Sequence, residues 1–200
     1  MNEFLSLPKN KVCNSEIEIN KSRFLGFSKH VDDVDQAKQF VEDIKKQYKD
    51  AKHVVYAYIV DGIQKSTDDG EPSGTAGRPI LEFLGHLGCN RISVVVVRYF
   101  GGIKLGTGGL LRAYVGSAKQ TIENNLQKFK KAQLFEGELD YNEFESLKYE
   151  IKQSNARIIS VDYGQKVKVK VVSFDQKLPK LSFIGEIFEA QGGEDANNWT

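Results

Sequence analysis

The 200-residue sequence lacks the features of disulfide-rich, membrane-spanning and secreted proteins. Its two cysteines, Cys13 and Cys89, form no CxxC motif, which excludes a disulfide framework and a cysteine metal site and favours reduced thiols. Its longest aliphatic run is the valine run at 94–97, whereas a membrane-spanning helix needs about 20 apolar residues. The first residues lack the basic segment and apolar core of a secretory signal. The sequence therefore predicts a cytoplasmic protein with no membrane partner.

An excess of charge of either sign is also missing. The chain has 28 basic and 27 acidic residues, so no global cationic field draws it to a polyanion. One stretch, residues 83–122, has no acidic residue at all, yet it holds 8 of the 18 glycines together with Arg91, Arg98, Lys104, Arg112 and Lys119. A site for a polyanion is therefore expected within this stretch.

Apolar spacing in the first part of the chain predicts both strands and helices. Alternating or continuous β-branched patterns predict strands at 12–19, 24–31, 53–60 and 92–99. Helical spacing covers 34–48, with Asp32 or Asp33 as N-cap, and 75–87, with Pro79 in the first turn. Residues 61–74 have no apolar periodicity and predict a long surface loop. A glycine-rich loop at 101–109 then leads into another helix.

A second pattern begins near residue 130. It predicts three strands and two helices in βαββα order, at 134–141, 142–154, 157–162, 165–174 and 178–190. The fold class is therefore α+β, with a first domain of residues 1–129, a second of residues 130–200 and a linker at 127–131. A complete split βαββαβ unit needs one more strand, for which residues 191–200 show no strand pattern.

The glycine-rich loop is the strongest candidate site. A buried strand, a loop and a helix N-terminus would place free backbone N–H groups and the positive end of a helix dipole together, which suits a phosphate group. The residues predicted to contact phosphate are Arg98, Gly101, Gly102, Lys104, Gly106, Gly108, Gly109 and Arg112. Their spacing matches neither of the common nucleotide-binding glycine motifs. The glycines could equally serve only tight turns and close helix packing.

A second loop, residues 68–79, carries the carboxylates of Asp68, Asp69 and Glu71. Their spacing matches no EF-hand loop, and we expect neither a metal nor a cofactor there. Asp69 and Glu71 are predicted to order the loop or to orient nearby cations. An enzymatic alternative stays open, in which Asp69 or Glu71 is a base and Lys104 and Arg112 clamp the substrate. The sequence assigns no catalytic residue.

Three of these segments together resemble the IMPACT family, in the two-domain form of its bacterial YigZ-type members. They are KSRFLGF at 21–27, DDGEPSGTAGRPIL at 68–81 and RYFGGIKLGTGGLLRAY at 98–114, and the resemblance runs from about residue 12 to about residue 190. It implies a first domain similar to the ribosomal-protein and elongation factor G domain IV fold. It also implies a second, ferredoxin-like domain similar to elongation factor G domain V, here without a visible last strand.

These fold similarities imply contact with RNA, the ribosome or a translation-associated protein. The expected function is therefore that of a non-catalytic cytoplasmic protein, associated with RNA or the ribosome through phosphate contacts, with a role in the regulation of translation. Fold resemblance alone does not establish an activity. Two alternatives stay open, an enzyme acting on a phosphorylated or peptide substrate and a protein-interaction module with purely structural glycines.

Overall fold

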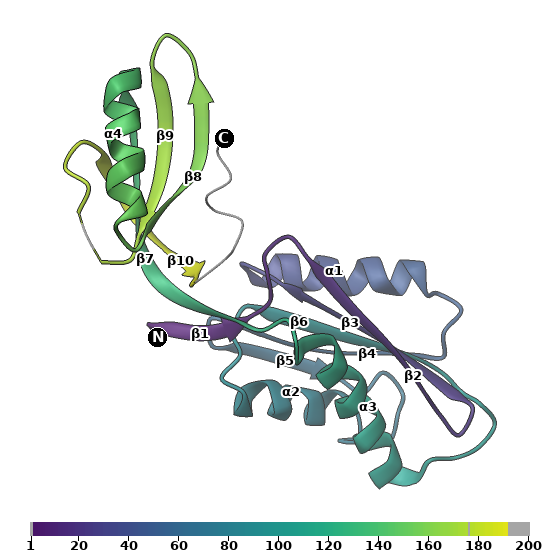
Figure 1. Ribbon diagram of the computed structural model, residues 1–200. Helices are drawn as coiled ribbons and strands as arrows, with labels where there is room; N and C mark the ends of the chain where they lie inside the picture. The colour runs from purple at the N-terminus through teal and green to yellow at the C-terminus, as the bar shows by residue number, and fades with distance from the viewer. Residues whose placement is uncertain (1, 176, 192–200) are drawn as a thin grey trace. The chain divides into compact units, whose positions relative to one another are not determined.

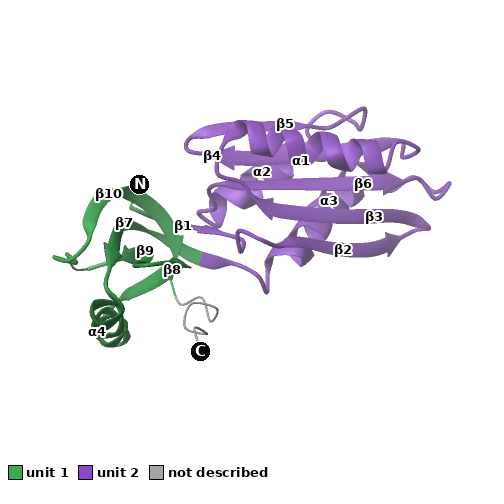
Figure 2. Ribbon diagram, turned by 90° about the horizontal axis from the view of Figure 1, so that it is seen from above, with its two compact units in different colours: residues 1–3, 128–200 green, residues 4–127 purple. Residues whose placement is uncertain are grey.

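The structure is a computed structural model that describes residues 2–175 and 177–191 (Figure 1). The chain is a mixed α+β protein of two compact units, one formed by residues 4–127 and the other by residues 1–3 with 128–200 (Figure 2). In the described part of the chain, no helix has both the length and the apolar character needed to cross a membrane.

A five-stranded antiparallel sheet forms the middle of the 4–127 unit. Its strand order is β2 (Val12–Ile19), β3 (Ser22–His30), β6 (Ile92–Tyr99), β4 (His53–Val60) and β5 (Ile63–Thr67) (Figure 2). The central strand is β6, whose β-branched side chains are buried on both faces. The bounds predicted for β2, β4 and β6 are confirmed. The prediction of a loop over 61–74 is wrong for residues 63–67, which form β5. These residues are exposed or half-buried, so their sequence has no apolar pattern typical of a strand.

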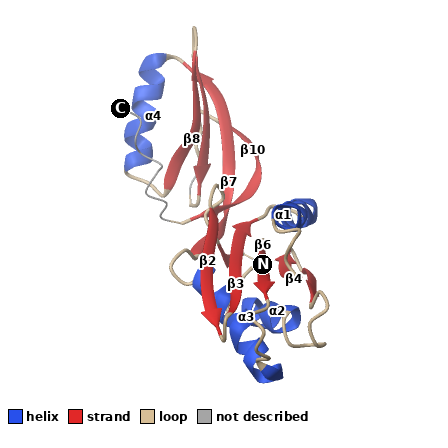
Figure 3. Cartoon of the chain, turned by 90° about the vertical axis from the view of Figure 1, so that its right-hand side faces the viewer, coloured by secondary structure: helices blue, strands red, loops and turns tan. Residues whose placement is uncertain are grey.

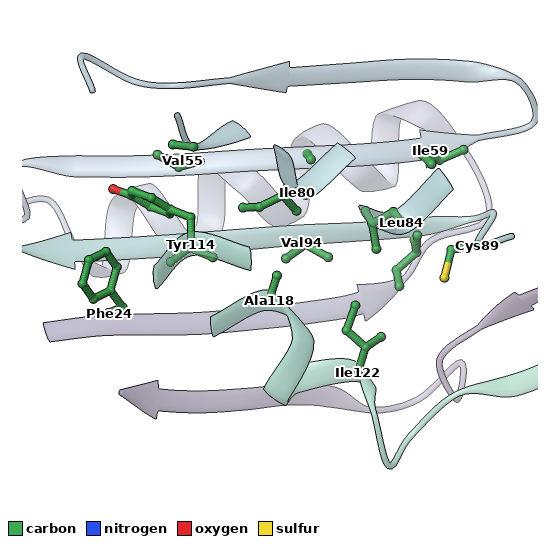
Figure 4. Packing of buried hydrophobic residues seen from close by; sticks show 14 of the residues in the cluster. Phe24, Val55, Ile59, Ile80, Leu84, Cys89, Val94, Tyr114, Ala118 and Ile122 are labelled. Carbon is green, nitrogen blue, oxygen red and sulfur yellow. The ribbon is translucent and has the colours of Figure 1, made fainter. Parts of the chain in front are cut away.

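Helices cover both faces of this sheet (Figure 3). On one face lies α1 (Val34–Gln47), and Asp33 caps it by accepting a hydrogen bond from the Gln36 backbone N–H. On the other face α2 (Gly77–His86) and α3 (Gly106–Ile122) pack on the strands, as Figure 4 shows for Ile80, Tyr114 and Val94. The first turn of α3 begins at Gly106, so the glycine-rich loop predicted at 101–109 is shorter than expected and its last four residues are helical.

The second unit is built on a sheet with the order β10-β7-β9-β8. The short strand β1 (Glu3–Ser6) starts in this unit with Glu3 and continues in the 4–127 unit. Its elements follow one another as β7 (Gln127–Leu139), α4 (Tyr141–Lys152), β8 (Ala156–Tyr163), β9 (Val167–Ser173) and β10 (Ser182–Ala190). The buried face of α4, with Phe144, Leu147 and Ile151, packs on apolar side chains of the sheet. This packing gives the unit a hydrophobic core of its own.

Two predictions for this unit are wrong. Residues 182–190 form a strand rather than a helix, because their β-branched and aromatic side chains pair with β7 although their spacing also fits a helix. A strand therefore follows β9 where the sequence analysis found none, and the described sheet has more than three strands. The boundary between the two units, after residue 127, falls within the linker predicted at 127–131, but these residues are the first of β7 rather than a loop.

Candidate functional site

One end of the five-stranded sheet gathers the three sequence segments that carry the family resemblance. At this end β3 and β4 begin while β5 and β6 finish, since Arg23 pairs with Tyr99 and His53 pairs with Arg98. We call it the glycine-loop end. It comprises the turn at 20–21, the acidic loop 68–76, the loop 100–105 and the first two turns of α3. At this end the acidic loop contacts the end of β6 through a side-chain hydrogen bond between Glu71 and Arg98.

A buried network centred on Glu71 joins the acidic loop to β6 and α3. Its Oε1 atom accepts hydrogen bonds from Arg98 Nη1 at 2.6 Å and from the Tyr114 hydroxyl at 2.7 Å. The side chains of Arg98 and Glu71 are only 6% and 4% exposed. Burial, together with the hydrogen bond to Glu71, raises the pKa of Tyr114 far above its usual value, so this hydroxyl remains a donor. The structure therefore places Arg98 inside the unit, paired with Glu71, rather than on the surface expected of a phosphate ligand.

The other carboxylates of the acidic loop bind backbone N–H groups. Asp68 accepts from the N–H groups of Gly74, Ala76 and Gly77 and so supplies acceptors at the start of α2, which has no side-chain N-cap of its own. Asp69 Oδ2 accepts from the Val54 N–H at 2.6 Å. These contacts are those of loop-ordering groups. Sequence reasoning missed the role of Asp68, because its bonds reach six to nine residues along the chain, further than ordinary capping spacing.

His53 joins the acidic loop to β4. Its Nδ1 donates to the Asp69 carbonyl oxygen at 2.8 Å, and its Nε2 lies 3.8 Å from Glu71 Oε1. The carboxylates of Asp69 and Glu71 thus both have internal donors, and His53 is buried beside them. This arrangement favours a structural role over the enzymatic alternative, because neither carboxylate is presented as a base to a ligand in solution.

At most glycine positions of the glycine-rich segment, the fold itself requires a residue without a side chain. A Cβ on Gly101 would lie 2.0 Å from the backbone carbonyl carbon of Lys21, and the Gly101 N–H donates to Ser22 Oγ at 3.1 Å. Gly102 and Gly106 have φ angles of +85° and +71°, which L side chains rarely adopt. A Cβ on Gly109 would come within 3.1 Å of the Leu105 Cβ.

Gly108 is different from these four. It is exposed, lies in the first turn of α3 and has no positive φ angle. A Cβ there would have only the Arg112 Nη1 atom nearby, at 3.6 Å. No close packing within the described residues therefore requires glycine at this position.

The cations of the glycine-loop end remain exposed. Lys104 and Arg112 are exposed, as are Lys21 and Lys52, and none of the four forms an ion pair with a carboxylate in residues 2–175 and 177–191. Leu105 occupies the N-cap position of α3 and provides no side-chain hydrogen bond. The uncapped N–H groups in the first turn of α3 are thus flanked in sequence by two exposed basic residues, Lys104 before the helix and Arg112 in its second turn.

Known proteins match this chain over most of its length. The model of the Impact N-terminal domain matches residues 20–122, and a domain of unknown function, DUF1949, matches residues 138–172. IMPACT family member YigZ of Escherichia coli is 38% identical over 172 residues, which is 82% of this chain and 84% of that protein. IMPACT family member YvyE of Bacillus subtilis is 39% identical over 157 residues, 76% and 72% of the two chains. A crystal structure titled only as that of a hypothetical protein aligns with a TM-score of 0.62, at 34% identity over 86% of each chain.

Proposed function

Because the chain belongs to the IMPACT family, we propose that it is a non-catalytic RNA-binding protein that contacts phosphates at the glycine-loop end. Its broad role in this proposal is the regulation of translation in the cytoplasm, with RNA or the ribosome as partner. The role in translation is inferred from the family resemblance, which implies a likeness to domains IV and V of elongation factor G. The β10-β7-β9-β8 order of the second unit supports a ferredoxin-like assignment for that domain.

The observation that carries the proposal is the open first turn of α3. Glycine inside a helix costs roughly 0.5–1 kcal/mol relative to alanine, and Gly108, like Gly85 in α2 and Gly116 further along α3, has no packing reason to be glycine. Gly108 differs from these two because it lies in the first turn of its helix, beside Arg112. A glycine at a helix N-terminus allows a phosphate to approach the backbone N–H groups closely. Arg112 Nη1, beside Gly108, can then donate to the same phosphate.

The charges around this turn favour an anion as well. The nearby carboxylates of Asp68, Asp69 and Glu71 accept hydrogen bonds from groups of the protein itself. Lys104 and Arg112, in contrast, form no ion pair with a carboxylate of the described residues. Gly101, Gly102, Gly106 and Gly109 shape the turn, and Arg98 acts indirectly through Glu71 and the acidic loop. The proposed contact groups are therefore Lys104, Arg112 and the α3 backbone from Gly106 to Gly109.

The test is to titrate wild type and the Lys104→Ala/Arg112→Ala variant with ribosomes and with short RNA at several salt concentrations. Loss of two phosphate contacts should flatten the plot of log affinity against log salt by roughly 1.4–1.8, at about 0.7–0.9 per contact. Neither side chain has a carboxylate partner among the described residues, so the free energy of unfolding should change by no more than about 0.5 kcal/mol.

The matched control is Lys46→Ala/Lys65→Ala. It removes the same charge from exposed positions on α1 and β5. The control should keep the wild-type salt dependence. Equal binding by wild type and the Lys104/Arg112 variant, or no binding by either, would refute the phosphate-contact proposal and favour a protein-interaction module.

A further inference from the structure

Exposed apolar side chains accompany the cations of the glycine-loop end. Phe100, Ile103 and Leu111 have 45%, 45% and 42% of their surface exposed. They occur in the same short stretch of chain as Lys104 and Arg112. Exposed apolar side chains that form a contiguous patch mark an interaction site, and these three are candidates for one. A ligand that engaged both kinds of side chain would offer an apolar face in addition to negative charge.

Phe100 is held in place by the buried network. The centre of its ring lies 5.4 Å from the Arg98 guanidinium carbon, and Lys52 Nζ lies 5.9 Å from the same centre. Arg98 is itself fixed by its ion pair with Glu71 and by the ring of Phe24, whose centre is also 5.4 Å away. The Phe100 ring is thus positioned from the protein side while almost half of its surface faces solvent.

The neighbouring aromatic residue, Tyr99, is already engaged. Its hydroxyl donates to Asp50 Oδ1 at 3.0 Å, and the Arg23 guanidinium lies 5.9 Å from its ring centre. Arg23 is in turn held by an ion pair with Glu16. Both rings have cations near them, so the difference between the two residues is exposure. Tyr99 is half-buried, whereas 45% of the surface of Phe100 is exposed and its ring has no polar group to engage.

We propose that Phe100 stacks on an unpaired base, so that the RNA bound at the glycine-loop end is single-stranded. This inference rests on the proposed function, because it takes the phosphate contacts of Lys104 and Arg112 as given. Every base has a flat face that can stack on an aromatic side chain, and alternation of bases with phosphates matches apolar side chains interspersed with cations. In a duplex the base faces are stacked inside the helix and cannot reach Phe100.

The experiment compares a fluorescein-labelled twelve-nucleotide oligouridine with a twelve-base-pair RNA duplex. Phe100→Ala should bind the oligouridine about tenfold more weakly than wild type, since loss of one stacking contact typically has this effect. Its salt slope and its weak duplex binding should not change, because no phosphate contact is lost. Phe100→Leu keeps the apolar bulk and should resemble Phe100→Ala, whereas Phe100→Tyr keeps the ring and should bind within about twofold of wild type.

Tyr149→Ala is the control, because it removes another exposed aromatic side chain, 67% exposed, from α4. It should leave oligouridine binding unchanged. Four results would overturn the stacking proposal. Unchanged oligouridine binding by Phe100→Ala, with weakened binding by Lys104→Ala/Arg112→Ala, would leave the phosphate-contact function standing. Duplex binding as tight as oligouridine binding, or equally tight binding of a polyglutamate peptide that also depends on Phe100, would identify another partner. Absence of any RNA binding by wild type would refute both proposals.

Discussion

At the scale of single residues, glycines a few positions apart in the same segment have opposite relations to the fold. Gly101 packs its backbone directly on Lys21, where a Cβ would lie 2.0 Å from a backbone carbon. Gly108 has space around it, with only the end of a flexible arginine near. The first glycine therefore serves folding, and the second is the one that the proposed ligand explains.

Alanine substitutions should separate these two roles. Gly101→Ala should destabilise the 4–127 unit by about 3 kcal/mol, because two backbone segments must move apart. Gly108→Ala should leave stability unchanged or raise it by about 0.5–1 kcal/mol, since alanine is the better helix former. Urea unfolding followed by circular dichroism measures the free energy of unfolding of both variants.

Gly108→Ala should nevertheless weaken RNA binding. Unaltered RNA affinity would show that no phosphate approaches this turn.

Residue roles were only partly predictable from sequence. The absence of acidic residues from 83–122 located Lys104 and Arg112, which are exposed and unpaired with any described carboxylate. The same pattern could not show that Arg98 is buried, because its partner Glu71 lies 27 positions earlier and is brought near by the pairing of β4 with β5 and β6. Tyr114 was missed for the same reason, since its hydroxyl reaches Glu71 only after α3 packs on the sheet.

At the scale of elements, β1 is attached to the end of β3 by a buried histidine. Ser6 Oγ and His30 Nδ1 are 2.8 Å apart, and His30 Nε2 lies 3.3 Å from Asp32 Oδ1. Burial lowers the pKa of His30, although the hydrogen bond and charge of Asp32 act in the opposite direction. Arg91 and Lys9, the other charges acting on this ring, also lower it. The native state therefore favours neutral His30.

This lowered pKa predicts a pH dependence of stability. Below the unfolded-state pKa of about 6.5, the unfolded chain binds a proton that native His30 resists, so stability is lost as the pH falls through that value. Urea unfolding between about pH 7.5 and pH 5.5 should show a steeper loss for wild type than for His30→Asn. Parallel stability curves for the two proteins would show that His30 does not contribute.

Strands with a strong apolar pattern were predictable, and weakly patterned ones were not. The continuous β-branched run of β6 allows one interpretation only, and its predicted bounds are those observed. Over residues 181–190 the spacing of Leu181, Ile184 and Phe188 also fits a helix face, and the pairing of β10 with β7 decides the outcome. The exposed β5 strand depends on its hydrogen bonds to β4, which local sequence does not reveal.

At the scale of the whole molecule, each unit has its own hydrophobic core. One core lies between the five-stranded sheet and its helices, and the other lies between α4 and the second sheet. Units with separate cores can in principle fold independently. The 4–127 unit also contains every residue of the proposed RNA site, so the second unit is not needed for the phosphate contacts themselves.

A fragment of residues 1–127 should therefore unfold cooperatively. Thermal and urea unfolding, each followed by far-ultraviolet and near-ultraviolet circular dichroism, should give coincident transitions. The fragment should retain the salt-dependent RNA binding of the full chain. A molten or aggregated fragment would show that the two units depend on each other for folding.

The central proposal is that RNA binds the first turn of α3, and its location can be observed directly. The measurement is a titration of ¹⁵N-labelled full-length protein with the twelve-nucleotide oligouridine at low salt, followed through backbone amide shifts. We predict saturable shifts at Lys104, Gly106 and Gly108. Amides beside the cavity of about 490 Å³ on the second sheet, such as those of Glu138 and Lys168, should not move. Shifts confined to that cavity, or no shifts at all, would contradict the proposal.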